Sequence, residues 1–238
     1  MNRHGDRHSD WHIGRYVWVI LLAVLLPLSA LADDASEASD KVKDAQEVIE
    51  DVMASPDKGI PKDLFKNVAG IAIFPGVMKA GFVLGGKYGR GVVLRYSKKH
   101  HTWTSPAFYS IGAASVGWQI GAQSTDLVLL IRSEKGLKGL LKNEFTLGAD
   151  AAIAAGPVGR RAEGSIDGSF KAEIWSYSRS RGLFAGVSFE GAKINILADY
   201  NHAYYGKSLT PRDILFGGKA RAPKSGVRLI HVLNKFSK

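Results

Sequence analysis

Residues 59–96 read GIPKDLFKNVAGIAIFPGVMKAGFVLGGKYGRGVVLRY, and residues 103–132 read WTSPAFYSIGAASVGWQIGAQSTDLVLLIR. Glycines recur every few residues in both stretches, with short apolar runs and single aromatic residues between them. This density of glycine disfavours a helix, because each glycine costs about 1 kcal/mol relative to alanine there. A bent sheet tolerates it, since glycine permits bulges, corners and close backbone approach. The pattern therefore predicts a strongly curved β-sheet.

The apolar runs among these glycines predict the strands. Val68–Phe74 is a buried strand closed by Pro75-Gly76, and Asp126–Ile131 is another. Gly81–Tyr96 has the pattern of a glycine-bent strand pair, followed by a charged turn at residues 97–101. Val116, Trp118 and Ile120 alternate with smaller or polar residues in Ser115–Gly121, a period of two that indicates a further strand.

The second half of the chain predicts more strands. Residues 146–158 are small and apolar, which indicates a tightly packed strand region. Apolar residues alternate with others in Phe170–Ser178, in 183–189 and in 192–198. Turns separate these three segments, so they predict an antiparallel meander.

Helices are expected at the start, in the middle and at the end of the chain. Asp34–Glu37 resembles a capping box, and the helix after it carries an apolar stripe of Val42, Ala45, Ile49 and Val52. Ser133 caps a short helix, and Thr210-Pro211 begins another that ends at Gly217-Gly218. A short helical turn after Pro61 and a final helix at Val227–Phe236 complete the set.

These elements predict an α+β fold. A curved, mostly antiparallel sheet, open or closed into a barrel, is covered by N-terminal, central and C-terminal helices. No repeat or linker interrupts residues 33–238, which we expect to form one domain.

Residues 1–32 have the pattern of a signal peptide. Three arginines form a basic leader, Tyr16–Leu28 is apolar, and Ala30–Ala32 is a small-residue cleavage site. A membrane anchor is the alternative, but this apolar run is shorter than the roughly 20 residues of a spanning helix. We therefore expect an exported protein, periplasmic or secreted and peripheral to the membrane. The chain has no cysteine, so a packed core and not disulfides must stabilise it.

The charge of the chain favours anionic partners. From Asp33 onward it contains 29 Lys/Arg and 20 Asp/Glu, a net charge of +9. Lipid headgroups, polyanionic sugars and nucleic acid are attracted by such an excess, although surface solubility explains it equally well. Basic residues cluster at six places, each of which alone is usually a solvated turn: Lys62/Lys66, Lys87/Arg90/Arg95, Lys98/Lys99, Arg160/Arg161, Arg179/Arg181 and Lys219/Arg221/Lys224/Arg228.

We predict a lipid-binding surface from the basic clusters of the glycine-rich region and the central helix. Each Lys or Arg held near an anionic bilayer contributes about 1 kcal/mol, so four or five on one face would localise a protein without a deep pocket. The candidate lipid-binding residues are Lys79, Lys87, Arg90, Arg95, Lys98, Lys99, Lys135, Lys138 and Lys142.

No motif predicts catalysis, a cofactor or a metal site. Gly81–Tyr88 nearly matches a phosphate-binding loop, but Tyr88 stands where Ser or Thr must bind magnesium. Ser115 lies in a degenerate nucleophile-elbow motif, yet it begins an alternating strand and not a strand-to-helix turn. His202 is the best candidate for a general base, but no nucleophile lies near it in sequence. We therefore expect that the protein is not an enzyme.

The ordered glycine and aromatic motifs resemble those of the SYLF domain family over residues 40–236. Each motif is weak alone, but their order and spacing together are specific. The matching pieces include Ala69–Pro75, Lys79–Phe82, Gly89–Val92, Trp103–Phe108, Gly117–Gln123, Thr125-Asp126, Gly156-Pro157, Tyr177-Ser178, Gly182-Leu183 and Tyr205-Gly206.

The resemblance implies a non-enzymatic lipid-binding protein that associates peripherally with anionic membranes. Eukaryotic members of the family bind phosphoinositides and some fungal members bind actin, so the alternative is a protein-interaction scaffold of the cell envelope. An outer-membrane barrel and an undetected hydrolase are weaker alternatives. The family's lipid contact is attributed to basic residues and an N-terminal amphipathic helix. That helix is Asp40–Met53 here, and its acidic second half disfavours insertion into anionic lipid. We expect no nucleic-acid partner.

Overall fold

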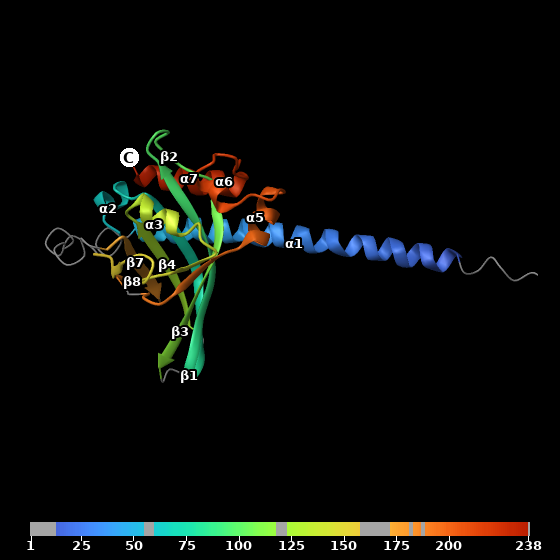
Figure 1. Ribbon diagram of the computed structural model, residues 1–238, viewed down its shortest axis with the longest axis horizontal. Coiled ribbons are helices and arrows are strands. Elements are labelled where there is room, and N and C mark those ends of the chain that lie inside the picture. The colour runs from blue at the N-terminus through green and yellow to red at the C-terminus, as the bar shows by residue number, and fades with distance from the viewer. Residues whose placement is uncertain are drawn as a thin grey trace, which may run out of the picture.

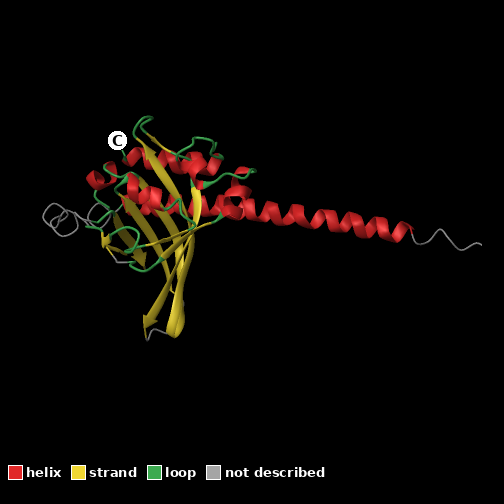
Figure 2. Ribbon diagram, in the orientation of Figure 1, coloured by secondary structure: helices red, strands yellow, loops and turns green. Residues whose placement is uncertain are grey.

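A curled β-sheet lies between two layers of helices in the computed structural model (Figure 1). The structure describes residues 13–54, 60–117, 123–157, 172–180, 183–186 and 189–237. The α+β class predicted from the sequence is confirmed. Figure 2 shows that the helices gather around one end of the sheet, and that strands extend beyond them at the other end.

In the described residues, nine strands form a single sheet in the order β5-β9-β3-β1-β4-β7-β6. Two short strands lie off this path, β2 on β1 and β8 on β7. The pairs are antiparallel except for β6 with β7. The strands are β1 (Gly70–Ser97), β2 (Thr102–Trp103), β3 (Ala107–Gly117), β4 (Gln123–Ile131), β5 (Glu144–Thr146), β6 (Ile153–Ala155), β7 (Ile174–Ser180), β8 (Leu183–Gly186) and β9 (Lys193–Ile196).

Strand β1 folds back on itself. Its 28 residues would extend about 90 Å if straight. Instead, a Cβ atom on Gly91 would lie 2.1 Å from the carbonyl oxygen of Ile73, and one on Gly89 would lie 2.8 Å from Val77. The chain therefore reverses between Val77 and Gly89. The first arm pairs with β4 and the second with β3. The strand pair predicted within Gly81–Tyr96 thus begins earlier, at Gly70.

Pro75-Gly76 is a bulge and not the strand end that the sequence predicted. The register of β1 against β4 shifts between Phe74 and Val77. Gly76 has a φ of 61°, and its N–H donates to Asp126 Oδ1 at 2.9 Å. Proline is tolerated at such a bulge because the ladder is already interrupted there.

Both faces of the sheet are buried at the end where the helices cover it. Ile71 and Ile73 lie in one core, while Ala72 and Phe74 lie in the other. This explains why the strand sequences are continuously apolar, since an alternating pattern requires one solvated face.

The helices divide between the two faces of the sheet. Buried residues of α1, α2, α5 and α7 share the core of Ile71, whereas those of α3 and α6 share the core of Phe74. The predicted caps of α3 and α6 are confirmed, because Ser133 Oγ accepts from Gly136 N and Thr210 forms a capping box with Asp213. The helices are α1 (Ile13–Met53), α2 (Lys62–Lys66), α3 (Glu134–Gly139), α5 (Ala198–Tyr205), α6 (Pro211–Leu215) and α7 (Lys224–Phe236).

Helix α1 does not begin at Asp34, as the capping-box pattern predicted, but continues from Ile13. Leucine and alanine, which favour helix, dominate residues 20–32. No proline or glycine follows Pro27 before Met53, so nothing in the sequence interrupts the helix at Asp34. The predicted stripe is confirmed: Val42, Ala45, Ile49 and Val52 are fully buried against the sheet.

The predicted meander is wrong at its third strand. Strands β7 and β8 pair as expected, but β9 pairs with β3 and β5 at the other side of the sheet. Within the described part of the small apolar region at 146–158, the structure has one short strand, β6, at one edge of the sheet, while β5 ends at Thr146 on the opposite edge. The predicted strand at Ser115–Gly121 is confirmed only to Gly117, since 118–122 lie outside the described residues.

In the part of the chain that the structure describes, no helix combines the length and the apolar composition needed to cross a bilayer.

Candidate anion-binding surface

Helix α7 presents a basic stripe to solvent. Lys224, Arg228, His231 and Lys235 recur at intervals of three or four residues, which places them on one face of the helix. All four are exposed, and the neighbouring Val227 is 55% exposed. The opposite face is buried in the core through Leu229, Val232 and Leu233.

Close packing fixes the orientation of α7. Ser225 Oγ lies 3.1 Å from Ser39 Oγ of α1 and 2.9 Å from the hydroxyl of Tyr204 on α5. A Cβ atom on Gly226 would lie 2.7 Å from the same hydroxyl, so glycine permits this approach. The stripe therefore has a defined direction relative to the sheet.

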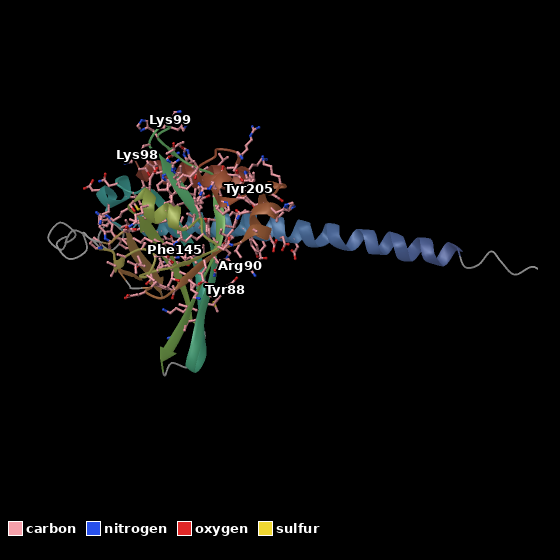
Figure 3. All side chains as sticks on the ribbon, viewed as in Figure 1. Tyr88, Arg90, Lys98, Lys99, Phe145 and Tyr205 are labelled. Carbon is pink, nitrogen blue, oxygen red and sulfur yellow. The ribbon has the colours of Figure 1, made fainter. Side chains whose placement is uncertain are left out.

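The turn between β1 and β2 lies beside the C-terminal end of α7. Asn234 Nδ2 donates to Thr102 Oγ1 at 2.9 Å, and Trp103 Nε1 donates to Ser237 Oγ at 2.8 Å. Lys98 and Lys99 are exposed at the tip of this turn. Figure 3 shows both lysines at the end of the molecule where the helices gather, far along β1 from Tyr88.

The sequence from Gly206 onward carries a large excess of positive charge. Residues 206–238 contain eight Lys/Arg and one acid, Asp213, whose carboxylate pairs with Lys219 at 2.8 Å. Among the described residues, no carboxylate lies within 4.0 Å of five cations that we call the C-terminal basic surface. These are Lys98, Lys99, Lys224, Arg228 and Lys235.

The other predicted lipid-binding residues are mostly engaged in ion pairs. Arg95 binds Glu134 at 2.8 Å and stacks on Phe216, with 4.8 Å between the guanidinium carbon and the ring centroid. Both this bond and the nearby lysines hold the pKa of Glu134 below its usual value. The remaining pairs on the same side are Lys135 with Glu173, Lys138 with Glu134, and Lys142 with Asp150.

The side chain of Arg90 links three elements: its own strand β1 and the helices α1 and α5. Its guanidinium contacts Glu37 of α1 and the hydroxyl of Tyr200 of α5. A hydrogen bond involving Tyr88 is the main reason that the pKa of Arg90 is raised. Burial and Glu37 raise the pKa of Tyr200 as well. We interpret Arg90 as a structural tie between α1 and the sheet.

Lys79 and Lys87 lie together, away from the C-terminal basic surface. The ammonium of Lys87 sits 4.6 Å from the ring centroid of Phe189. Burial lowers the pKa of Lys87, and repulsion from Lys79 lowers it further. Of the nine predicted residues, the structure thus brings only Lys98 and Lys99 into the surface of unpaired cations.

The basic stripe of α7 is not among the predicted site residues, although the spacing of its cations indicates it. Lys224 and Arg228 were visible as a basic cluster, but a cluster alone is usually a solvated turn. The repeat of 224, 228, 231 and 235 in a helix without acids is the specific signal, and it extends the site to Lys235.

Comparison with known proteins identifies similar chains. A family profile described as "Ysc84: Las17-binding protein actin regulator" matches residues 112–236. The chain is 36% identical over 180 residues to LAS seventeen-binding protein 3 of Saccharomyces cerevisiae, covering 74% of this chain and 39% of that protein. It is 31% identical over 210 residues to the human SH3 domain-containing YSC84-like protein 1, covering 88% of this chain and 60% of that protein. The chain thus spans less than two thirds of either relative.

Proposed function

Because this chain belongs to the Ysc84 family of SYLF domains, whose members are named for binding and regulation, we propose that it acts by binding and not by catalysis. The target that we propose is an anionic membrane surface. The protein would associate with it peripherally, at the cell envelope, after residues 1–32 are removed.

The observation that carries this proposal is the C-terminal basic surface. Its cations have no carboxylate partner within 4.0 Å among the described residues, so no adjacent carboxylate of the described chain neutralises their charge. Each contributes about 1 kcal/mol near an anionic bilayer, so the five together, about 5 kcal/mol, account for attachment with a Kd of a few tenths of a millimolar. Val227 lies within the stripe and supplies an apolar side chain for shallow insertion.

The amphipathic face of α1 plays no part in this mechanism. Its apolar stripe is buried in the core, and the rest of its surface is acidic. Residues 33–53 contain eight Asp/Glu and two Lys, and of these acids Glu37 and Asp51 are paired with arginines of the sheet. Such a face is repelled by anionic lipid. The membrane contact therefore belongs at the end formed by α7 and the β1–β2 turn.

Vesicle co-sedimentation tests the proposal. We expect binding to phosphatidylcholine vesicles that contain phosphatidylglycerol, little binding to phosphatidylcholine alone, and loss of binding as salt rises. The variant Lys224→Glu/Arg228→Glu/Lys235→Glu should bind at least about 100-fold more weakly.

A matched control changes the net charge equally on other faces. Lys41→Glu/Lys43→Glu/Lys193→Glu reverses three lysines that already take part in surface ion pairs. We expect this control to keep most of the binding. Equal loss in both variants, or equal binding to neutral vesicles, would refute the electrostatic mechanism.

A second function, binding to a protein partner, is favoured by the names of the relatives, which describe a Las17-binding protein. The acidic outer face of α1 is the surface with a suitable charge for a basic partner. Binding of one purified envelope protein in the absence of lipid, lost on reversal of Glu47 and Glu50 but kept in the α7 variant, would support this alternative.

A further inference from the structure

A surface cleft of about 650 Å³ lies between the end of α3, β9, α5 and the start of α6. This volume is in the usual range for sites that bind small molecules. Its lining includes the apolar residues Leu141, Ile196 and Leu209, which we call the apolar wall. The cleft is separate from the five cations of the C-terminal basic surface.

Two opposite charges line this cleft without neutralising each other. Asp199, in the first turn of α5, and Arg212, in α6, are both exposed. Neither takes part in an ion pair within 4.0 Å with another described residue. By contrast, many charged side chains elsewhere on this surface are paired, including Asp213 next to Arg212.

Two polar side chains also line the cleft and can orient a ligand. Ser208 Oγ and His202 Nδ1 lie 3.4 Å apart, and both residues line the cleft. A hydroxyl and an imidazole supply both a donor and an acceptor. The cleft thus combines a carboxylate, a guanidinium, a polar pair and an apolar wall.

We propose that this cleft binds a zwitterion with an apolar body. Asp199 would accept hydrogen bonds from a primary ammonium, and Arg212 would bind a carboxylate or phosphate. The apolar wall would contact the body of the ligand. A ligand with a single charge satisfies one of the two residues and places a like charge near the other, so it is disfavoured. A free amino acid and a phosphoethanolamine headgroup share this chemistry.

Titration calorimetry with matched probes tests the cleft. L-leucine represents the free amino acid, and dihexanoylphosphatidylethanolamine, used below its micelle concentration, represents the headgroup. Each is compared with analogues that lack one charge: 4-methylpentanoate and 3-methylbutylamine for leucine, and dihexanoylphosphatidic acid for the lipid. We expect at least one zwitterion to bind about tenfold or more tightly than its analogues, a difference set by one lost charge contact.

Variants assign the binding to the two charges. Asp199→Asn and Arg212→Gln should each weaken the zwitterion about tenfold. Glu47→Gln on α1 and Arg221→Gln outside the cleft should not, and thermal unfolding checks that all four fold. Binding of leucine alone identifies a free amino-acid type of ligand, and binding of the lipid alone identifies a headgroup.

The proposal is overturned if neither zwitterion binds, if the singly charged analogues bind equally well, or if the Asp199 and Arg212 variants behave as the controls do. Because these probes are monomeric, failure here leaves vesicle binding by α7 untouched. The triple α7 variant should retain cleft binding, which separates the two proposals.

Discussion

At the scale of single residues, glycine acts mainly by allowing two stretches of backbone to touch. A Cβ atom on Gly91 would lie 2.1 Å from Ile73 O and 2.8 Å from the Cα of Phe74, both of them backbone atoms. Gly86, in the same strand, is exposed and would place its Cβ no closer than 3.8 Å to any neighbour. A close backbone contact therefore requires glycine at position 91, whereas no such contact requires it at position 86.

We expect Gly91→Ala to lower the free energy of unfolding by about 1–3 kcal/mol or more, because the Ile73 backbone would have to move. Gly86→Ala should leave it unchanged or raise it slightly, since alanine costs less conformational entropy on folding. Urea denaturation measures both. Similar values for the two variants would contradict the folded-back arrangement of β1.

Asp213 gives the fold a pH-dependent component. Bonds from Lys219 and Thr210 lower the pKa of its carboxyl from 3.8 to about 2 in the folded protein. The ionised form therefore stabilises the fold above pH 3.8, and this contribution is lost as the pH falls toward 2. Asp213→Asn should unfold at a lower temperature than the parent protein at pH 7. The difference in Tm should shrink between pH 4 and pH 2, whereas a constant difference would argue against this capping role.

At the scale of elements, α1 is part of the core and not a free amphipathic helix. Ile49 is fully buried, and Arg179 joins Asp51 of α1 to Asp126 of β4. Arg90 makes a second tie, to Glu37. Detaching the helix would therefore expose one face of the sheet.

Substitutions on the two faces of α1 measure this docking. Ile49→Ala should lower the free energy of unfolding by about 2–5 kcal/mol, because it leaves a cavity in a packed core. Glu47→Ala, on the exposed face, should change it by less than about 0.5 kcal/mol. If Ile49→Ala reduced vesicle binding without reducing stability, α1 would be the membrane element instead.

Elements that depend on local pattern were predictable from the sequence, and those that depend on long-range pairing were not. The caps at Ser133 and Thr210 and the stripe of α1 follow from residues a few positions apart. The bulge at Pro75-Gly76 was mistaken for a strand end, because its partner Asp126 lies 50 residues away. The placement of β9 beside β3 was missed for the same reason.

Ion pairing is the aspect of the candidate site that the sequence does not show. Sequence shows that Arg95 and Lys142 are basic, but not that Glu134 and Asp150 neutralise them. Lys98 and Lys99 are among the predicted residues, and both are exposed in the turn after β1. To predict Lys224, Arg228 and Lys235 as site residues, one must know which face of α7 is buried.

At the scale of the whole molecule, charge is distributed unevenly. The outer face of α1 is acidic, whereas α7 contains no acid and the segment from Gly206 onward carries eight Lys/Arg. The arm of β1 that carries Tyr88, a residue that is 51% exposed, extends away from both (Figure 3). An anionic surface should therefore orient the protein with α7 and the β1–β2 turn facing it.

Residues 33–237 should fold without the preceding segment, because the buried stripe of α1 begins at Ala38. A chain that starts at Asp33 should have the same Tm as the full chain within about 2 °C, the shift that a change well below 1 kcal/mol produces. Differential scanning calorimetry of both chains checks this expectation. A markedly lower Tm would mean that residues 1–32 help to hold the fold together.

Site-specific fluorescence tests most directly whether α7 is the membrane-facing surface. The chain has no cysteine, so Val227→Cys and Tyr88→Cys each give a single position for a polarity-sensitive dye. When vesicles containing phosphatidylglycerol are added, the dye at 227 should shift to shorter wavelength and be quenched by lipid-attached quenchers, while the dye at 88 should not respond. A response at 88 with none at 227 would contradict the account, because the membrane would then contact the Tyr88 segment of β1 and not α7.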